Sequence, residues 1–426
     1  MTTEEIACKH IARVEGHGSL YVTTKDGQLV DVKMSVDEGA RLFEAFLVDR
    51  HYTEVPEMAC RICAICSASH RIVSTVAIEK AFGIQVDKQV TDLRRLLIWG
   101  EYVESHILHA LYLALPDYVG HESVISALAD FPDVVKIALK LKKLGNDLQI
   151  LTGGREIHQV TPMVGGFSSY PTKQALMEIK DRINDARPDL QACVDVWAGL
   201  EEIPFHRETE YLAIRREDEY ALVDGEIATL GGIRAPVEDY KKFITERVPD
   251  YSFAKAGELN GRSFFVGALA RLNINNDHLS PFAKKVIDQL GIKLPSFNTF
   301  HNNAAQLIET AQVFDMAIDT IDSLLASDLE WHEPEVVPKA GVGTHITEAP
   351  RGSLVHSYEF GSDGLLRKAD IIAPTTMNYT NMEDDVRAFF PQIAHKSKEE
   401  IQFDLNRLIR AYDPCISCSC HMVEVK

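Results

Sequence analysis

Residues 302–329 read NNAAQLIETAQVFDMAIDTIDSLLASDL, and this stretch decides the fold class of the chain. Its apolar side chains recur alternately four and three residues apart, at Leu307, Ala311, Phe314, Ile318, Ile321 and Leu325. That spacing places one continuous apolar stripe along a helix of about seven turns. A long helix with such a stripe is typical of a packed helical bundle.

The same periodicity continues outward from this helix. It covers residues 67–82, 90–115, 132–151 and 172–200, the last interrupted by Pro188. Tight-turn dipeptides predict antiparallel hairpins around Asp26-Gly27, Asp224-Gly225 and Asp363-Gly364. No Pro/Gly/Ser-rich linker and no internal repeat divides the chain. We therefore predict a mainly α fold with small peripheral β hairpins (α+β), in which the long helices of a single domain, residues 1–426, surround a buried centre.

The composition excludes several classes of protein. Hydrophobic residues make up 46% of the chain and charged residues 25%, the balance of a globular protein. Asp and Glu number 63 against 44 Lys and Arg, and the net charge of -19 disfavours nucleic acid as a partner. The apolar run at residues 107–119 is broken by Pro116 and Asp117, so no membrane span is expected. The acidic start of the chain lacks signal-peptide features, which favours the cytoplasm, although a subunit exported with a signal-bearing partner would look the same.

Six of the eight cysteines fall in two clusters near opposite ends of the chain. The first begins at Cys60, continues as Arg61-Ile-Cys63-Ala-Ile-Cys66-Ser-Ala-Ser-His70 and directly precedes a helical pattern. The second reads Asp413-Pro414-Cys415-Ile-Ser-Cys418-Ser-Cys420-His421, and Pro414 predicts that the preceding helix ends near Asp413. A helix N-terminus lowers the pKa of a thiol, so Cys63 and Cys66 are expected to be ready to bind metal as thiolates.

The spacing of the cysteines leaves the type of site open. Four thiolates suit a tetrahedral zinc, an iron–sulfur cluster or a softer redox metal. Each pair could also bind separately, or one pair could be inert buried thiols. A shared site closes a loop of about 350 residues, so the core would have to anchor both ends of the chain.

Taken together, Arg61-x-Cys63-x-x-Cys66-x-x-x-His70 and Asp413-Pro414-Cys415-x-x-Cys418-x-x-His421 resemble the two signatures of nickel–iron hydrogenase large subunits. Further similar segments run in family order along the chain: Arg13-Val-Glu15-Gly-His17-Gly, Arg41-Leu-Phe-Glu44, residues 106–117, Gly154-Arg155-Glu-Ile-His158, Glu348-Ala-Pro350-Arg351-Gly and Pro374-Thr375-Thr376. Family members often carry glycine where this chain has Ala64. The alanine resembles cytoplasmic, nucleotide-linked multi-subunit members, which are also called sulfhydrogenases.

The resemblance implies a bimetallic centre that cleaves dihydrogen reversibly and heterolytically into protons and electrons. Nickel is then held by Cys63, Cys66, Cys415 and Cys418, and the second cysteine of each pair also bridges to an iron that carries cyanide and carbon monoxide. A buried magnesium or iron near the C-terminus is implied as well, with Glu44 and His421 as ligands and a backbone carbonyl near Ala373 as a weaker candidate.

The resemblance also assigns roles to side chains around the centre. Glu15 matches a proton-relay carboxylate, with a surface Arg13/Glu15 pair as the alternative. Arg351 is expected to lie over the open metal position, with Pro350, Asp117 and Asp413 around it.

Three further assignments follow from the same resemblance. His70 matches a donor to a bridging thiolate, unless it is a buried histidine satisfied by the backbone. Thr375 matches a residue that hydrogen-bonds a cyanide. His106 and His109 are expected to line the interior near Asp117 rather than to bind metal.

The chain lacks parts that such an enzyme needs, which points to partners. It has no phosphate-binding Gly-x-x-x-x-Gly-Lys motif and no spare cysteines spaced for a four-cysteine cluster. Electrons are therefore expected to leave through an iron–sulfur small subunit, and the resemblance adds further iron–sulfur and flavin or NAD(P)-binding subunits. Residues 155–166 are expected to face the electron-transfer partner, although their glycines could instead serve close packing.

The last five residues, 422–426, match an extension that a maturation protease removes after His421, with nickel-loading factors acting before the cleavage. Two other functions stay open at this point. One is a non-catalytic electron-transfer scaffold like the related quinone-reductase subunits, and the other is a structural zinc or iron–sulfur protein.

Overall fold

The computed structural model describes residues 3–128 and 130–420. Its longer helices are α3 (Ser67–Phe82), α4 (Lys88–Ile107), α6 (Pro132–Gly153), α7 (Lys173–Ala198), α8 (Ala268–Asn275), α9 (Pro281–Leu290), α10 (His301–Ala326), α11 (Pro374–Ile393) and α12 (Lys398–Ala411). Short helices are α1 (Phe43–Leu47), α2 (Val55–Ala59), α5 (Val124–Ala127) and α13 (Ile416–Ser419). None of the helices in these ranges is long and apolar enough to cross a bilayer.

Within residues 3–128 and 130–420, the strands form five small sheets. Two of them have three strands: β1 (Thr3–Cys8), β2 (Gly18–Lys25) and β3 (Gln28–Val36), and β12 (Gly341–Ala349), β13 (Gly352–Phe360) and β14 (Leu366–Ile372). A four-stranded sheet has the order β11 (Phe264–Phe265), β6 (Glu210–Arg215), β7 (Glu226–Thr229) and β8 (Arg234–Ala235). The remaining pairs are β4 (Pro162–Met163) with β5 (Gly166–Phe167), and β9 (Ile244–Arg247) with β10 (Ala256–Leu259).

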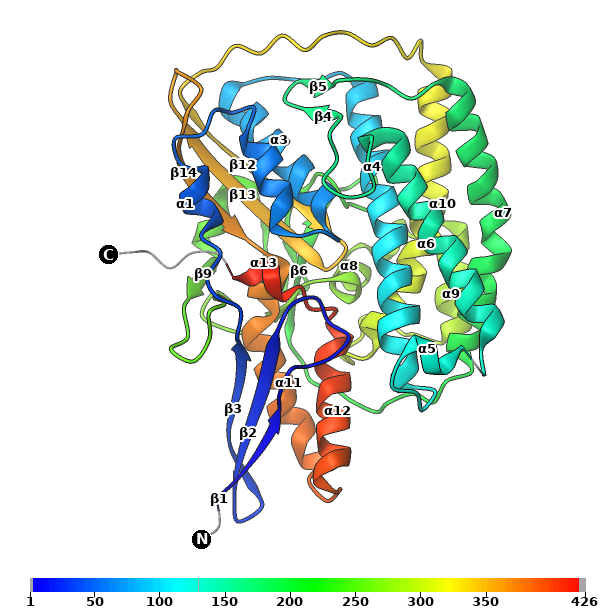
Figure 1. The fold of residues 1–426 in the computed structure, drawn as a ribbon, viewed down its shortest axis with the longest axis vertical. Coiled ribbons are helices and arrows are strands. Elements are labelled where there is room, and N and C mark those ends of the chain that lie inside the picture. The colour runs from blue at the N-terminus through cyan, green and yellow to red at the C-terminus, as the bar shows by residue number, and fades with distance from the viewer. Residues whose placement is uncertain (1–2, 129, 421–426) are drawn as a thin grey trace.

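Helices α4, α6, α7, α9 and α10 stand side by side as a bundle on one side of the molecule (Figure 1). The predicted stripe of α10 faces inward, and Leu307, Ala311, Phe314 and Ile321 are almost completely buried. Helices α4 and α6 cross so closely that a β-carbon at Gly145 would lie 2.5 Å from the backbone nitrogen of Glu104. Only glycine fits at that crossing.

On the other side of the molecule, α3 packs against the β12–β13 hairpin, and the short helix α13 lies between this half and the N-terminal sheet (Figure 1). The N-terminal region and the C-terminal segment therefore meet here, where Glu15 and Cys415 form a β-bridge. The prediction of a mainly helical protein with small sheets is confirmed.

Details differ from the sequence expectations. Pro188 does not interrupt α7, because it lies on the exposed face of the helix, where water can satisfy the carbonyl that its missing N–H leaves free. The predicted helix at 90–115 is α4 followed by a π-helical segment, Leu108–Ala114. The hairpin predicted around Asp224-Gly225 forms between β6 and β7, but the dipeptide ends a longer connection, residues 216–225.

Candidate metal centre

Four cysteines from the two ends of the chain form one buried cluster. Their sulfur atoms all lie within 4.8 Å of one another. The Sγ–Sγ distance is 3.4 Å for Cys63 and Cys415, 3.4 Å for Cys66 and Cys418, and 2.8 Å for Cys415 and Cys418. The structure thus brings both pairs into a single site, and separate sites for each pair are excluded.

Local structure explains how each thiol is presented. Cys63 follows a 3₁₀ turn in extended conformation, and Cys66 is the N-cap residue of α3. On the other side, α12 ends at Ala411, and Cys415 and Cys418 are carried on the start of α13. An irregular segment was expected after Pro414, but residues Ile416–Ser419 form one short helical turn.

The core anchors the returning C-terminal segment. The backbone N–H of Ile416 donates to the Glu15 carbonyl at 2.9 Å, and the N–H of Arg41 donates to the Cys420 carbonyl at 2.7 Å. Thr375, in the first turn of α11, accepts the N–H of Cys415 on its Oγ1 at 2.8 Å. These bonds anchor the segment to the core, as the long loop requires.

Protonation differs among the four thiols. Hydrogen bonds from Cys415, Cys418 and Cys66 lower the pKa of Cys63 well below its ordinary value. Burial instead raises the pKa of Cys66, Cys415 and Cys418, so the expectation of a lowered pKa at both helix-end thiols is wrong for Cys66. The four buried sulfurs can all ionise only beside a compensating cation, and soft anionic sulfur is the donor set of a redox-active transition metal.

Glu15 lies directly against the cluster. The Sγ of Cys415 donates to Glu15 Oε2 at 3.2 Å, and the backbone N–H of Ser417 donates to the same oxygen at 3.1 Å. The alternative of a surface pair with Arg13 is not formed, because Arg13 binds Asp117 and the Leu113 carbonyl. Glu15 is only partly buried, so it connects the cluster with the outside.

His70 lies on the other side of the cluster, completely buried in α3. Its Nε2 lies 3.7 Å from Cys418 Sγ, and its Nδ1 lies 3.1 Å from His356 Nε2. Burial lowers the pKa of His70 to about 4, so the ring is neutral at physiological pH. Its partners are side chains, not the backbone, and in the tautomer protonated at Nε2 the single ring N–H faces the Cys418 sulfur.

Arg351 is buried in the turn between β12 and β13. Its Nε donates to Asp413 Oδ1 and to the Asp413 carbonyl, both at 2.9 Å. Burial opposes its charge, but Asp413 and the nearby thiols of Cys415 and Cys63 raise the pKa of Arg351 well above its ordinary value. Its Nη1 is buried and has no hydrogen-bond partner within the described residues. A fixed cation with a free N–H therefore lies near the sulfur cluster.

Asp117 belongs to a neighbouring network. Its two carboxylate oxygens pair with Arg13 and with Arg410, which leaves Asp413 as the carboxylate that holds Arg351. Asp413 has a left-handed backbone, with φ of 52°. Although burial works against it, Arg351 lowers the pKa of Asp413, so this carboxylate is ionised.

Glu44 is buried in α1, three residues after Arg41, whose backbone N–H binds the Cys420 carbonyl of the C-terminal segment. Its Oε1 accepts the N–H of Ile371 at 2.7 Å and lies 3.5 Å from Lys255 Nζ. Its Oε2 is buried and lacks a partner within ranges 3–128 and 130–420. Burial raises the pKa of Glu44 to about 7. The second implied ligand, His421, lies outside the described residues.

His106 and His109 are engaged with polar groups of the interior. The Nε2 of His106 pairs with Glu309 at 2.9 Å, and His109 bonds Gln306 and the Arg410 carbonyl. Glu309, Gln306, His356 and Arg271 are buried polar residues near the site that the sequence patterns did not reveal. Glu309 lies two residues after Leu307, on the face of the helix opposite the apolar stripe, so the periodicity gave no signal for it.

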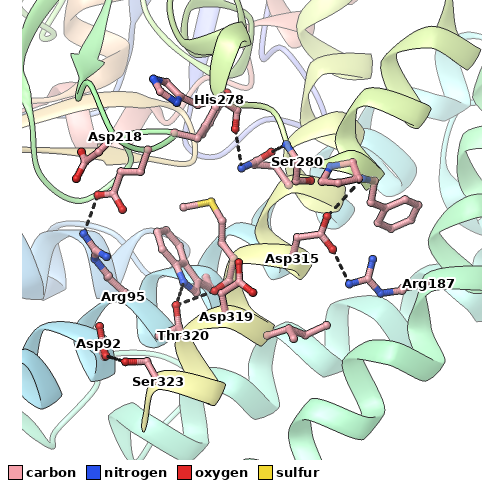
Figure 2. A pocket seen from close by; sticks show the side chains of 18 of the residues that line it. Asp92, Arg95, Arg187, Asp218, His278, Ser280, Asp315, Asp319, Thr320 and Ser323 are labelled. Atoms are coloured by element: carbon pink, nitrogen blue, oxygen red, sulfur yellow. Dashed lines mark hydrogen bonds and ion pairs between the residues drawn. The ribbon is translucent and has the colours of Figure 1, made fainter. Parts of the chain in front are cut away.

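A groove of about 830 Å³ lies between α4, α7, α9 and α10, and none of the four clustered cysteines lines it (Figure 2). Its charged side chains engage one another, as in the pairs Arg187–Asp315 and Arg95–Glu219 and the hydrogen bond from Ser323 to Asp92. The chemistry therefore belongs to the buried cluster and not to this groove.

A pocket of four buried thiols, with a cation, carboxylates and a neutral histidine around it, defines a metalloenzyme with a redox-active centre. The profile of the family described as nickel-dependent hydrogenase matches residues 41–148 and 224–421. Sulfhydrogenase 1 subunit alpha of Pyrococcus furiosus is 36% identical over 425 residues, which cover 99% of this chain and 98% of the relative. Sulfhydrogenase 2 subunit alpha of the same organism is 34% identical, over 99% and 100% of the two chains.

Solved structures give the same result. An NAD+-reducing [NiFe]-hydrogenase in the H2-reduced state superposes with a TM-score of 0.87 at 25% identity, covering 98% of this chain and 99% of the other. The Ni-Fe-Se hydrogenase of D. vulgaris Hildenborough superposes with a TM-score of 0.80 at 25% identity, covering 99% and 100%. The chain therefore belongs to the nickel-dependent hydrogenase family, as the large catalytic subunit of a multi-subunit enzyme. These results do not favour the scaffold and zinc alternatives.

Proposed function

We propose that this subunit cleaves dihydrogen heterolytically at the cysteine cluster, beside Arg351, and that the proton leaves through Cys415. The proposal depends on one observation. Four thiol sulfurs lie within 4.8 Å of one another, and a buried guanidinium with a partnerless Nη1 lies near them within the part of the chain that the structure describes. The donor set suits nickel, which Cys63, Cys66, Cys415 and Cys418 would hold, and Cys66 and Cys418 would also be ligands of an iron with cyanide and carbon monoxide. When bound, this centre supplies redox chemistry and an open coordination position.

The surrounding residues handle charge and protons. Arg351 stays protonated, so it positions and polarises dihydrogen rather than accepting its proton. The thiol of Cys415 passes a proton to the Glu15 carboxylate over 3.2 Å, and Glu15 delivers it toward the surface because it is partly exposed. His70 orients the sulfur of Cys418 with a ring N–H.

Four other residues of the site have supporting roles. Asp413 fixes Arg351, and Asp117 fixes the neighbouring Arg410. Pro350 shapes the turn that carries Arg351, and Thr375, beside the cluster, hydrogen-bonds a cyanide.

A divalent cation is proposed at Glu44. The unpaired, buried Oε2 of Glu44 and the unpaired, buried Oε1 of Glu246 are hard oxygen donors in the described chain, and both carboxylates contact Lys255. Magnesium prefers such ligands. With His421 and the carbonyl of Ala373, this ion would tie the C-terminal segment to the core.

The electrons are proposed to pass to an iron–sulfur small subunit and then to subunits that bind flavin and NAD(P), in the cytoplasm. The similarity to sulfhydrogenase alpha subunits and to an NAD+-reducing enzyme supports this route. Residues 155–166, which carry the exposed apolar side chains of Ile157, Val160 and Met163, are the proposed contact with the small subunit.

Metal analysis and infrared spectroscopy of the purified complex test the proposal. We expect nickel and iron in equal amounts at the cluster and stretching bands of cyanide and carbon monoxide. Zinc without nickel, or nickel without those bands, would reject it. The mass of the mature subunit tests the tail: we expect the loss of residues 422–426, and a full-length active subunit would contradict cleavage after His421.

A further inference from the structure

Arg271, on the short helix α8, uses all five of its N–H donors although it is completely buried. Its Nε and Nη2 bind the two carboxylate oxygens of Glu309, at 2.7 and 2.6 Å. The second hydrogen of Nη2 goes to the Pro350 carbonyl at 2.8 Å. Nη1 donates to Glu348 Oε2 at 3.1 Å and to the Ala349 carbonyl at 3.0 Å. Three consecutive residues, 348–350, are therefore bound by one guanidinium, directly before Arg351.

The two glutamates that bind Arg271 are themselves fixed. Glu309 also accepts hydrogen bonds from the hydroxyl of Tyr220 at 2.7 Å and from His106 at 2.9 Å. Although burial opposes its charge, Arg271 lowers the pKa of Glu309 to about 2, so this carboxylate is ionised. Glu348 Oε1 accepts the N–H of Ile214 and the hydroxyl of Ser353. The guanidinium is consequently held between rigid partners on α10 and β12.

The turn that carries Arg351 also packs tightly against the start of α8. Gly352 has a φ of 133°, and a β-carbon there would lie 2.9 Å from the backbone nitrogen of Gly267. In addition, the hydroxyl of Tyr102 donates to the Glu348 carbonyl at 2.9 Å, and the ring of Tyr102 lies 5.1 Å from the Arg271 guanidinium carbon. The turn and α8 therefore form one rigid unit.

We propose that Arg271 is a positioning residue, which sets the place of the Arg351 guanidinium relative to the sulfur cluster by holding the Glu348 side chain and the carbonyls of Ala349 and Pro350. This inference rests on the proposed role of Arg351. The planar guanidinium offers five N–H donors in fixed directions, which match the two carboxylates and the two carbonyls. A lysine ammonium offers three donors from one nitrogen. The ion pairs alone are a weak source of stability, because buried charges lose most of their attraction to desolvation.

The first test compares Arg271→Lys with Arg187→Lys in the intact complex. Arg187 pairs with Asp315, which like Glu309 is on α10, and it contacts neither the turn nor residues 155–166, so it controls for the loss of an arginine–carboxylate pair on this helix. We expect Arg271→Lys to lower kcat per nickel by about 10- to 100-fold with little change in the KM for dihydrogen. The intensity of the infrared bands per nickel should stay at the wild-type level, and hydrogen exchange should accelerate in the peptide covering 349–353. Arg187→Lys should change none of these.

The second test is a double-mutant cycle with Arg351→Lys. If Arg271 acts through Arg351, its side chain matters little once Arg351 is replaced. Adding Arg271→Lys to the Arg351→Lys variant should then lower kcat by a further factor of less than about 3. Equal losses in both backgrounds would show a structural role and overturn the inference, as would an unchanged kcat per nickel in Arg271→Lys. If the Arg271→Lys subunit does not assemble, Tyr102→Phe is tested in its place. We expect Tyr102→Phe to lower kcat by about 2- to 5-fold in the wild-type background and not in the Arg351→Lys background. An unchanged kcat in Arg351→Lys itself would instead reject the proposed role of Arg351.

Discussion

Glu15 Oε2 lies 3.2 Å from the sulfur of Cys415, although the two residues are 400 positions apart in the chain. The contact is maintained by the backbone, because the Glu15 carbonyl accepts the N–H of Ile416 and its side chain accepts the N–H of Ser417. A carboxylate held in this way against a thiol is placed to accept its proton.

Replacing Glu15 with glutamine should abolish turnover without removing the metal. Glutamine keeps the shape and an acceptor oxygen for Ser417 but cannot take up a proton at neutral pH. We expect a loss of at least about 100-fold in dihydrogen oxidation, with nickel content and infrared bands unchanged. Glu219→Gln, which removes a carboxylate paired with Arg95 outside the site, is the control. Full activity in Glu15→Gln would exclude the proton route.

Cysteine substitutions should separate ligands from bystanders. Cys418 belongs to the four-sulfur cluster, whereas the equally buried Cys420, two residues further on, donates to the Ile416 carbonyl instead. We expect Cys418→Ser to lower nickel content at least about 10-fold, since a hard hydroxyl is a poor ligand for a soft metal, and Cys420→Ser to keep it. Nickel per subunit, measured by mass spectrometry, checks both. Equal nickel in the two variants would contradict the ligand assignment.

Gly145→Ala should destabilise the bundle. Its new methyl group would meet the Glu104 backbone at 2.5 Å, so α4 and α6 would have to separate. We expect a loss of about 1–3 kcal/mol in the free energy of unfolding, seen as a lower denaturation midpoint in urea. At Gly39 a β-carbon meets nothing within 4 Å, so Gly39→Ala is the control and should be close to neutral. Equal stability of the two variants would show that the crossing tolerates expansion.

His345 should make the protein less stable at acid pH. Burial lowers its pKa from 6.5 to about 3, so the unfolded chain takes up a proton that the folded chain refuses. Stability is therefore complete above about pH 6.5 and decreases, as the pH falls toward 3, by about 1.4 kcal/mol per pH unit for this group.

His345→Gln should remove the contribution of one titrating group from the slope of the unfolding free energy against pH between pH 6.5 and 4, measured by urea denaturation. Part of the slope remains, because burial lowers the pKa of His70 as well. The exposed His332 provides the control, and His332→Gln should leave the slope unchanged. An unchanged slope in His345→Gln would refute the assignment.

Local patterns predicted much of the fold. The periodicity at 67–82 corresponds to α3, and the Asp363-Gly364 turn joins β13 to β14. Strand β12 and the π-helical segment after Ile107 were missed, since pairing with β13 and packing against the interior create them. The Arg13/Glu15 alternative was wrong for the same reason: Arg13 finds Asp117, which is distant in sequence and adjacent in space.

By itself, the sequence determined which chemistry is available, because thiol spacing, helix periodicity and turn residues act over a few neighbouring positions. It specified two cysteine pairs, the long helices and the arginine of the 348–352 segment. Only the tertiary structure decided which atoms meet: Cys63 with Cys415, Arg351 with Asp413, and Arg271 with the backbone before Arg351. Those contacts join segments far apart along the chain, and the packing of the whole core, not any local preference, fixes their distances.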